Sequence, residues 1–259
     1  MSAPEVVVHA DAEVLAAAVA ARLVTTLVDA QASRGSASVV LTGGGTGIAV
    51  LEQVRASSAA SAVDWRRVNV FWGDERFLPA GHPDRNETQA RAALLDHVDI
   101  DPARVFAMEP SDGATGDDPD AAAAVYAGNL SAHSSPGAHE MAPRFDALLL
   151  GMGEEGHVAS LFPDSPGVHE QQRGVVAVRD CPKPPPTRIS LTLPAIRSAA
   201  QVWLCVSGEV KAQAVQLALG GVGEVVLPAA GARGRDRTLW LLDRSAAGQL
   251  PHELYAPLD

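Results

Sequence analysis

Cysteine is scarce in this 259-residue sequence, which contains only Cys181 and Cys205. Two cysteines are too few for a disulfide framework, and they lack the spacing of metal ligands. The first fifteen residues lack the basic and apolar regions of a signal peptide. We therefore expect two reduced thiols and a cytoplasmic protein.

Positively charged and aromatic residues are also scarce, and long apolar runs are absent. The chain has 20 Lys and Arg against 31 Asp and Glu, a net charge of −11 that disfavours a nucleic-acid surface. Aromatic residues make up 4%, too few for a base-stacking platform. No apolar run approaches the roughly 20 residues of a membrane helix. We expect neither nucleic acid nor membrane as a partner, but a small anionic substrate stays open because a site is local.

The composition is 47% hydrophobic, which is enough to bury a core. The length suits a single domain over residues 1–259. Short β-rich runs alternate with helical periodicity. Strands are predicted at Glu5–His9, Ala37–Leu41, Val68–Trp72, Val105–Met108, Phe145–Leu150, Gly174–Val178, Arg188–Thr192, Gln201–Val206 and Thr238–Asp243. Helices are predicted from Asp11 to Gly35 and over about 48–55, 86–97, 119–130 and 208–219.

This alternation is typical of an α/β fold. It predicts a mostly parallel sheet with helices on both faces, a Rossmann-like arrangement. Ligands in such folds bind beyond the carboxyl ends of the strands. The loops that leave those ends are therefore the candidate functional segments.

The first such loop is TGGGTG at 42–47, between a strand and a helix. Glycines let a backbone approach a ligand closely, and the helix N-terminus offers free N–H groups to an anion. The loop is therefore suited to bind a phosphate or an oxyanion. The lysine of a nucleotide P-loop is missing. The alternative is a tight turn without a ligand.

Two further loops carry cations. Asp74, Glu75 and Arg76 follow the strand that ends at Trp72. Arg76 is suited to clamp a phosphate, and Asp74 or Glu75 is suited to orient hydroxyls or to hold the arginine. Lys211 falls in the first turn of a predicted helix, where it opposes the helix dipole but can point at an anion. For both segments the alternative is an ordinary solvent-exposed position.

The loop GMGEEGH at 151–157 matches the dinucleotide pattern G-x-G-x-x-G. Its mid-chain position, its two glutamates and the prolines that follow disfavour a dinucleotide. His157 with Glu155 two residues before it suits a general base near neutral pH. The other seven histidines are predicted to be surface residues: His9, His82, His97, His133, His139, His169 and His252.

The sequence has no G-x-S-x-G elbow, no H-E-x-x-H motif and no Cys/His cluster. A hydrolytic site would therefore use a water activated by histidine. The missing motifs disfavour a covalent or metal mechanism for such a site.

With these segments in order, the chain resembles the 6-phosphogluconolactonases along nearly its whole length. The resemblance rests on LTGGGTG (41–47), VNVFWGDERFLP (68–79), HPDRNE (82–87), LLLGMGEEGHVASLFPDS (148–165), KPPPTRISLT (183–192), SGEVKA (207–212) and TLWLLD (238–243). It implies the fold of glucosamine-6-phosphate deaminase and a cytosolic, often monomeric enzyme. The implied reaction is hydrolysis of 6-phospho-D-glucono-1,5-lactone in the pentose phosphate pathway, without a cofactor.

The resemblance also implies roles for individual residues. His157 would be the general base and Glu155 the acid that orients it, although the family usually has Asp there. Asp74 and Arg76, with Gly43, Gly44 and Lys211, would contact the substrate or its phosphate. Arg188 is a further candidate phosphate contact; alternatively it pairs with a carboxylate at the rim. The role of Lys183 stays open.

The sequence departs from the family pattern a second time, at Arg85. This residue stands where a serine commonly precedes Asn86. The departure bears on the polar contacts near Asn86 and leaves the reaction class unchanged.

Two alternative functions stay open. A glucosamine-6-phosphate deaminase typically carries an acid in the run after its Gly-His, whereas this chain reads HVASLFP at 157–163. A sugar-phosphate sensor would bind without turnover and usually has a DNA-binding module, for which this chain has no spare segment. The lactonase prediction is the preferred one.

Overall fold

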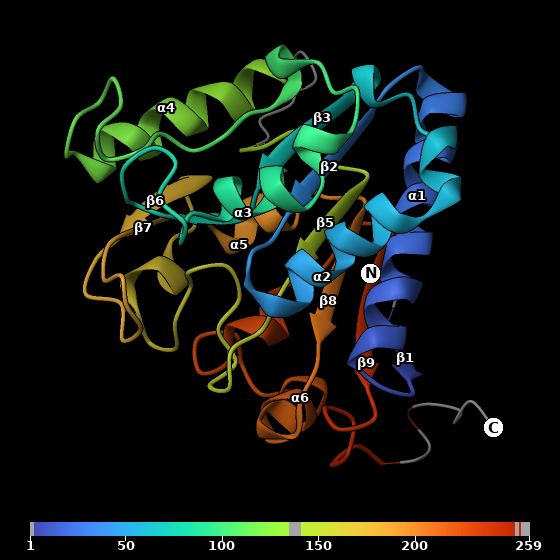
Figure 1. Cartoon of the computed structure of the whole chain (residues 1–259). Coiled ribbons are helices and arrows are strands. Elements are labelled where there is room, and N and C mark those ends of the chain that lie inside the picture. The colour runs from blue at the N-terminus through green and yellow to red at the C-terminus, as the bar shows by residue number, and fades with distance from the viewer. Residues whose placement is uncertain (1–2, 135–140, 252–253, 255–259) are drawn as a thin grey trace.

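The computed structural model describes residues 3–134, 141–251 and 254. Its centre is a six-stranded sheet in which every pair of neighbouring strands is parallel (Figure 1). The predicted α/β class is thus confirmed. In spatial order the strands are β1 (Glu5–His9), β9 (Arg237–Asp243), β8 (Gln201–Val206), β5 (Ala147–Leu150), β2 (Ala37–Leu41) and β3 (Val68–Trp72).

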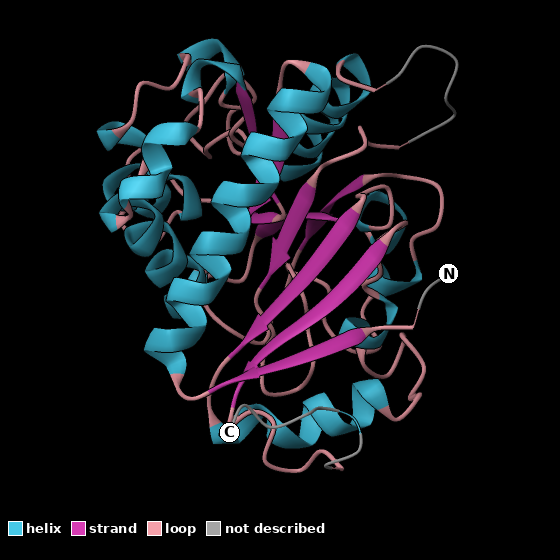
Figure 2. Cartoon of the chain, turned by 90° about the vertical axis from the view of Figure 1, so that its right-hand side faces the viewer, coloured by secondary structure: helices cyan, strands magenta, loops and turns pink. Residues whose placement is uncertain are grey.

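Helices cover both faces of this sheet (Figure 2). Successive strand residues point to opposite faces, so Val39 and Leu149 pack in one apolar cluster while Val40 and Leu148 pack in the other. One face packs against α1 (Ala12–Arg34), α2 (Gly44–Ala56) and α3 (Asn86–Ala93). The other packs against α4 (Pro119–Ala132), α5 (Leu193–Ile196) and α6 (Ala212–Leu219).

Helix α1 forms where the sequence pattern predicts a helix. The Asp11 carboxylate accepts a hydrogen bond from the Val14 N–H at 2.9 Å, which caps the first turn. Gly35 ends the helix with φ of 78°, in the left-handed region. Four apolar residues of the helix that recur at a spacing of four are all buried: Leu15, Val19, Leu23 and Leu27.

A second, antiparallel sheet lies beside the first and consists of β4 (Asp74–Arg76), β7 (Arg188–Leu191) and β6 (Val175–Val178). The expectation that Asp74–Arg76 is a loop was wrong. Gly73 joins the two sheets, because its N–H donates to Leu41 O and its carbonyl accepts from the Leu191 N–H. The chain therefore continues from β3 directly into β4, and the side chains of Asp74 and Arg76 are held by a strand ladder.

Other differences concern element ends. Of the predicted strand Val105–Met108, only Val105 pairs, in an isolated bridge with Val70. The helix expected over 86–97 breaks at Leu94, and the one expected over 208–219 begins as a 3-10 turn, Glu209–Lys211. Helix α2 starts at Gly44 rather than Ile48.

His9 is also placed differently from the prediction. It is buried, with Nδ1 3.1 Å from Leu242 O, because it is the last residue of β1 and pairs with Asp243 of β9. His139 and His252 lie outside the described residues. Among the helices of the described residues, none is long and apolar enough to cross a membrane.

Candidate active site

A cleft of about 250 Å³ opens at the carboxyl ends of β2, β3, β5 and β8. This is the edge where ligands bind in parallel α/β sheets. All the candidate site residues named from the sequence line it except Glu75, which is buried, and Glu155, which contacts His157. The residues that line the cleft include Gly43, Gly44, Asp74, Arg76, Asn86, Gly153, His157, Lys183, Arg188 and Lys211.

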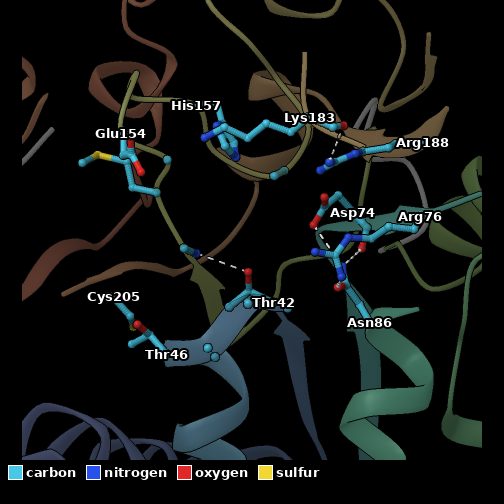
Figure 3. A pocket seen from close by; sticks show the side chains of 18 of the residues that line it. Thr42, Thr46, Asp74, Arg76, Asn86, Glu154, His157, Lys183, Arg188 and Cys205 are labelled. Atoms are coloured by element: carbon cyan, nitrogen blue, oxygen red, sulfur yellow. Dashed lines mark hydrogen bonds between the residues drawn. The ribbon is translucent and has the colours of Figure 1, made fainter. Parts of the chain in front are cut away.

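The glycine loop forms the floor at the N-terminus of α2 (Figure 3). Gly43 precedes the first turn, and no described side chain caps it, so the first-turn N–H groups face the cleft. Thr42 Oγ1 accepts from the Gly151 N–H at 3.2 Å and joins this loop to the one that carries His157. A methyl group on Gly43 would overlap Asn86 Oδ1, so the loop and Asn86 are in close contact.

His157, Glu155 and Lys183 form what we call the base cluster. Glu155 lies between the other two: Oε1 is 3.0 Å from His157 Nδ1, and Oε2 accepts from Lys183 Nζ at 3.0 Å. The Glu155–His157 contact is close enough for an ion pair but is not aligned as a hydrogen bond, and Nδ1 has no hydrogen-bond partner among the described residues. The longer side chain of Glu, in place of the Asp usual in the family, therefore still reaches the imidazole.

The electrostatics of the base cluster suit a neutral histidine beside an anionic glutamate. Burial lowers the pKa of His157, as does Lys183, while Glu155 and Asp74 act in the opposite direction. Burial alone would raise the pKa of Glu155, but its own backbone N–H, Lys183 and His157 together lower it. The imidazole is thus unprotonated near neutral pH, with a carboxylate ready to stabilise its protonated form.

The imidazole of His157 is fixed by packing on two sides. Its ring centroid lies 4.5 Å from that of Phe162. On the other side the Gly153 N–H donates to His157 O at 3.0 Å, and a methyl group on Gly153 would overlap the ring. Gly153 is therefore required for the position of the ring, a different use from the dinucleotide pattern that the sequence literally matches.

Asp74, Arg76 and Asn86 form the arginine cluster. Arg76 Nη1 donates to Asn86 Oδ1 at 2.5 Å and to Asp84 O at 2.9 Å. Asn86 Nδ2 in turn donates to Asp74 O at 2.8 Å, and Ser160 Oγ donates to Asp74 Oδ2 at 2.7 Å. Figure 3 shows Arg76 and Asp74 beside Asn86 at the start of α3.

Sequence reasoning did not select Asn86 or Ser160 as site residues. Each is buried and contacts Asp74 through a fold contact that no local spacing reveals. For each the only signal was its place in a segment that carries the resemblance, HPDRNE (82–87) for Asn86 and LLLGMGEEGHVASLFPDS (148–165) for Ser160.

Lys211 lines the cleft from the turn before α6. Burial lowers the pKa of its ammonium group, and Lys183 adds to this, while Asp243 and Glu154 oppose it. Asp243 accepts from Ser207 Oγ at 2.5 Å and from the Gly208 N–H at 3.2 Å, which fixes the turn. Gly208 has φ of 103°, a conformation that favours glycine.

Arg188 lines the cleft from β7, but most of its donors are engaged by the proline-rich loop. Nε donates to Pro185 O at 3.2 Å, and Nη2 donates to Lys183 O at 3.0 Å and to Pro184 O at 3.3 Å. The sequence analysis considered a phosphate contact or an ion pair with a carboxylate for Arg188. Neither includes these hydrogen bonds from the guanidinium to main-chain carbonyls. Its evident structural effect is to hold the loop that carries Lys183.

The cleft is locally cationic although the chain is acidic. Four cationic side chains line it, Arg76, Lys183, Arg188 and Lys211, against the carboxylates of Asp74 and Glu154. Together with the α2 N-terminus this favours an anionic ligand. Within the described residues, no three His, Cys, Asp or Glu side chains gather so as to hold a metal ion.

Comparison with known proteins places this geometry in a family. Residues 10–240 match the model of glucosamine-6-phosphate isomerases/6-phosphogluconolactonase. The 6-phosphogluconolactonase of Streptomyces coelicolor is 61% identical over 98% of this chain and 97% of its own length. That of Mycobacterium tuberculosis is 55% identical over 93% of this chain and 96% of its own.

The fold has relatives among solved structures. 6-Phosphogluconolactonase from Trypanosoma brucei superposes with a TM-score of 0.83 and 29% identity, over 96% of this chain and 99% of its own. A monomeric glucosamine-6-phosphate deaminase shares the fold with a TM-score of 0.77 and 21% identity, over 94% of this chain and 99% of its own. The chain belongs to the glucosamine-6-phosphate isomerase/6-phosphogluconolactonase family.

Proposed function

We propose that the chain hydrolyses 6-phospho-D-glucono-1,5-lactone to 6-phospho-D-gluconate, the lactone-opening reaction of the oxidative pentose phosphate pathway. The observation that carries this proposal is the His157–Glu155 pair in the same cationic cleft as Arg76, Lys211 and the α2 N-terminus. A base and an anion site in one cleft match a substrate with a reactive carbonyl and a remote phosphate. The 61% and 55% identical relatives with this activity support it.

The chemistry begins with His157. Nδ1 faces Glu155, so Nε2 is the nitrogen that takes a proton from water while the resulting hydroxide attacks lactone C1. The carbonyl oxygen becomes an oxyanion, which backbone N–H groups of the surrounding loops stabilise. The C1–ring oxygen bond then breaks, and protonated His157 returns its proton to the ring oxygen. Glu155 stabilises the imidazolium between the two proton transfers.

Arg76 and Lys211, with Gly43 and Gly44 at the α2 N-terminus, bind the phosphate in this proposal. Their contacts with a group remote from C1 position the lactone at His157, which lowers the entropic part of the barrier. Asp74 orients substrate hydroxyls. Arg188 contributes by holding the Lys183 loop and by its charge at the rim of the cleft.

We further propose that residues 1–259 act as one domain and as a cytoplasmic monomer. The cleft draws residues from both sheets, which supports a single functional unit. Cys181 and Cys205 are free thiols, as expected in a reducing compartment. Light scattering at assay concentration tests the monomer.

The test is hydrolysis of freshly generated lactone, coupled to 6-phosphogluconate dehydrogenase, with spontaneous opening subtracted. We expect fast turnover by the wild type, and no release of ammonia from glucosamine 6-phosphate. No acceleration over the spontaneous reaction would refute the lactonase proposal. Ammonia release would then identify a deaminase, and binding without turnover would identify a sensor.

A further inference from the structure

We propose that Glu75, a buried carboxylate outside the cleft, is a positioning residue that holds Asn86 and Arg76 in their binding geometry, with Arg85 as its counter-ion. This inference rests on the proposed function, because it assigns Arg76 to the substrate phosphate. Neither Glu75 nor Arg85 lines the cleft. Both are almost completely buried, at 1% and 0% exposure.

The carboxylate of Glu75 is bound to backbone on both oxygens. Oε1 accepts from the Asn86 N–H at 2.6 Å and from the Arg76 N–H at 2.8 Å. Oε2 accepts from the Glu87 N–H at 2.9 Å. Two of these three donors are the first two residues of α3, so Glu75 on β4 caps α3 from another element.

This cap fixes the side chain that holds Arg76. Asn86 is the first residue of α3, and its side chain bridges Arg76 Nη1 and Asp74 O. Its Oδ1 also packs against Gly43 in the glycine loop. A displacement at the α3 N-terminus is therefore transmitted to both Arg76 and the floor of the cleft.

Arg85 supplies the positive charge that a buried carboxylate needs. Its Nη2 lies 3.7 Å from Glu75 Oε2 and 3.3 Å from Glu87 Oε2, and it donates to Met108 O at 2.7 Å. Burial raises the pKa of Glu75 to about 7, against the opposing effects of Arg85 and the three N–H groups. The charged form of Glu75 therefore depends on Arg85 and the three N–H groups.

The geometry requires a carboxylate rather than an amide. Glutamine has the same shape, but its NH₂ group would face at least one of the N–H donors that Glu75 now accepts. The buried N–H would then lose its acceptor and the α3 N-terminus would shift. Glu75→Gln therefore tests the contact without removing volume.

The experiment measures kcat and KM for the lactone with Glu75→Gln and a matched control, Asp146→Asn. Asp146 also accepts a backbone N–H, from Ser38 at 2.8 Å, and pairs with Arg34, but at the amino ends of the strands. We expect Glu75→Gln to raise KM about tenfold, the effect of weakening one charge-assisted contact, with kcat within about twofold of the wild type. The control should keep the wild-type KM.

A double-mutant cycle with Arg76→Ala separates positioning from general loss of stability. If Glu75 acts through Arg76, Glu75→Gln adds less than about twofold to the KM of Arg76→Ala, whereas a purely structural effect multiplies. Should Glu75→Gln fail to fold, Glu75→Asp keeps the charge beside Arg85 but is too short to reach all three N–H groups, and the same cycle applies.

The outcomes distinguish this inference from the proposed function. No turnover by the wild type refutes the proposed function itself. Turnover by the wild type with an unchanged KM in Glu75→Gln, or with multiplicative KM effects in the cycle, overturns the positioning role alone.

Discussion

The base cluster and the arginine cluster share one cleft but are built differently. Glu155 and Lys183 lie on loops and keep 32% and 44% of their side chains exposed. Asp74 and Asn86 lie on a strand and a helix and are less than 10% exposed. Hydrogen bonds to buried backbone fix the arginine cluster, whereas a glycine, an aromatic ring and an ion pair fix the base cluster.

In the proposed mechanism, proton transfer by His157 and phosphate binding by Arg76 therefore depend on different neighbouring residues. A change at the support of His157 should affect kcat, because it moves the base without altering the phosphate contacts. A change at the support of Arg76 should affect KM. Substitutions at each set of neighbouring residues test whether the effects on kcat and KM are separate.

Among substitutions at the residues that support the two clusters, the largest effect is expected from Gly153→Ala. The new methyl group would overlap the His157 ring, so the imidazole must move. Displacement of a catalytic group by about 1 Å costs on the order of 100-fold in rate. We expect kcat for the lactone to fall by about that factor with KM little changed; an undiminished kcat would show that Gly153 does not determine the position of the base.

Gly43→Ala is the counterpart in the arginine cluster. The methyl group would overlap Asn86 Oδ1, which now accepts from Arg76. Loss of this charge-assisted hydrogen bond should raise KM by about tenfold. Steady-state kinetics at a fixed pH checks this, and a fall in kcat alone would contradict the separation of the two clusters.

Lys183→Met should shift the pH profile. Lys183 lowers the pKa of His157 and also shares Glu155 with it. Without Lys183 the pKa of His157 rises, so the base stays protonated to higher pH. The acid limb of kcat/KM should therefore move to higher pH, and screening keeps this shift small because Lys183 is partly exposed. A downward shift would refute the assigned role.

The smallest effect is expected from Gly128→Ala, in α4 and remote from both clusters. A Cβ at this position meets open space, and alanine favours a helix interior by about 0.5–1 kcal/mol. Thermal or denaturant unfolding should show that increase in stability. The kinetic constants should be unchanged, which makes this variant the control for the two glycine substitutions above.

The same contrast explains what the sequence could predict. His157 and Glu155 are two residues apart, and the strand–helix alternation puts their loop at the carboxyl edge, so local spacing was sufficient. Asn86 meets Asp74 twelve residues away, through hydrogen bonds that require the turn between β4 and α3 to be folded. The short strand β4 was missed because its ladder partner, β7, lies more than a hundred residues further along the chain.

The most direct test of the account is a kinetic cycle of His157→Ala, Arg76→Ala and the double variant on the phosphorylated lactone. The account predicts that His157→Ala lowers kcat by about 10²–10⁴-fold at a similar KM, the range for loss of a general base. Arg76→Ala should raise KM by about 10- to 100-fold at a similar kcat, and the double variant should combine both effects. A wild-type kcat in His157→Ala would contradict the account.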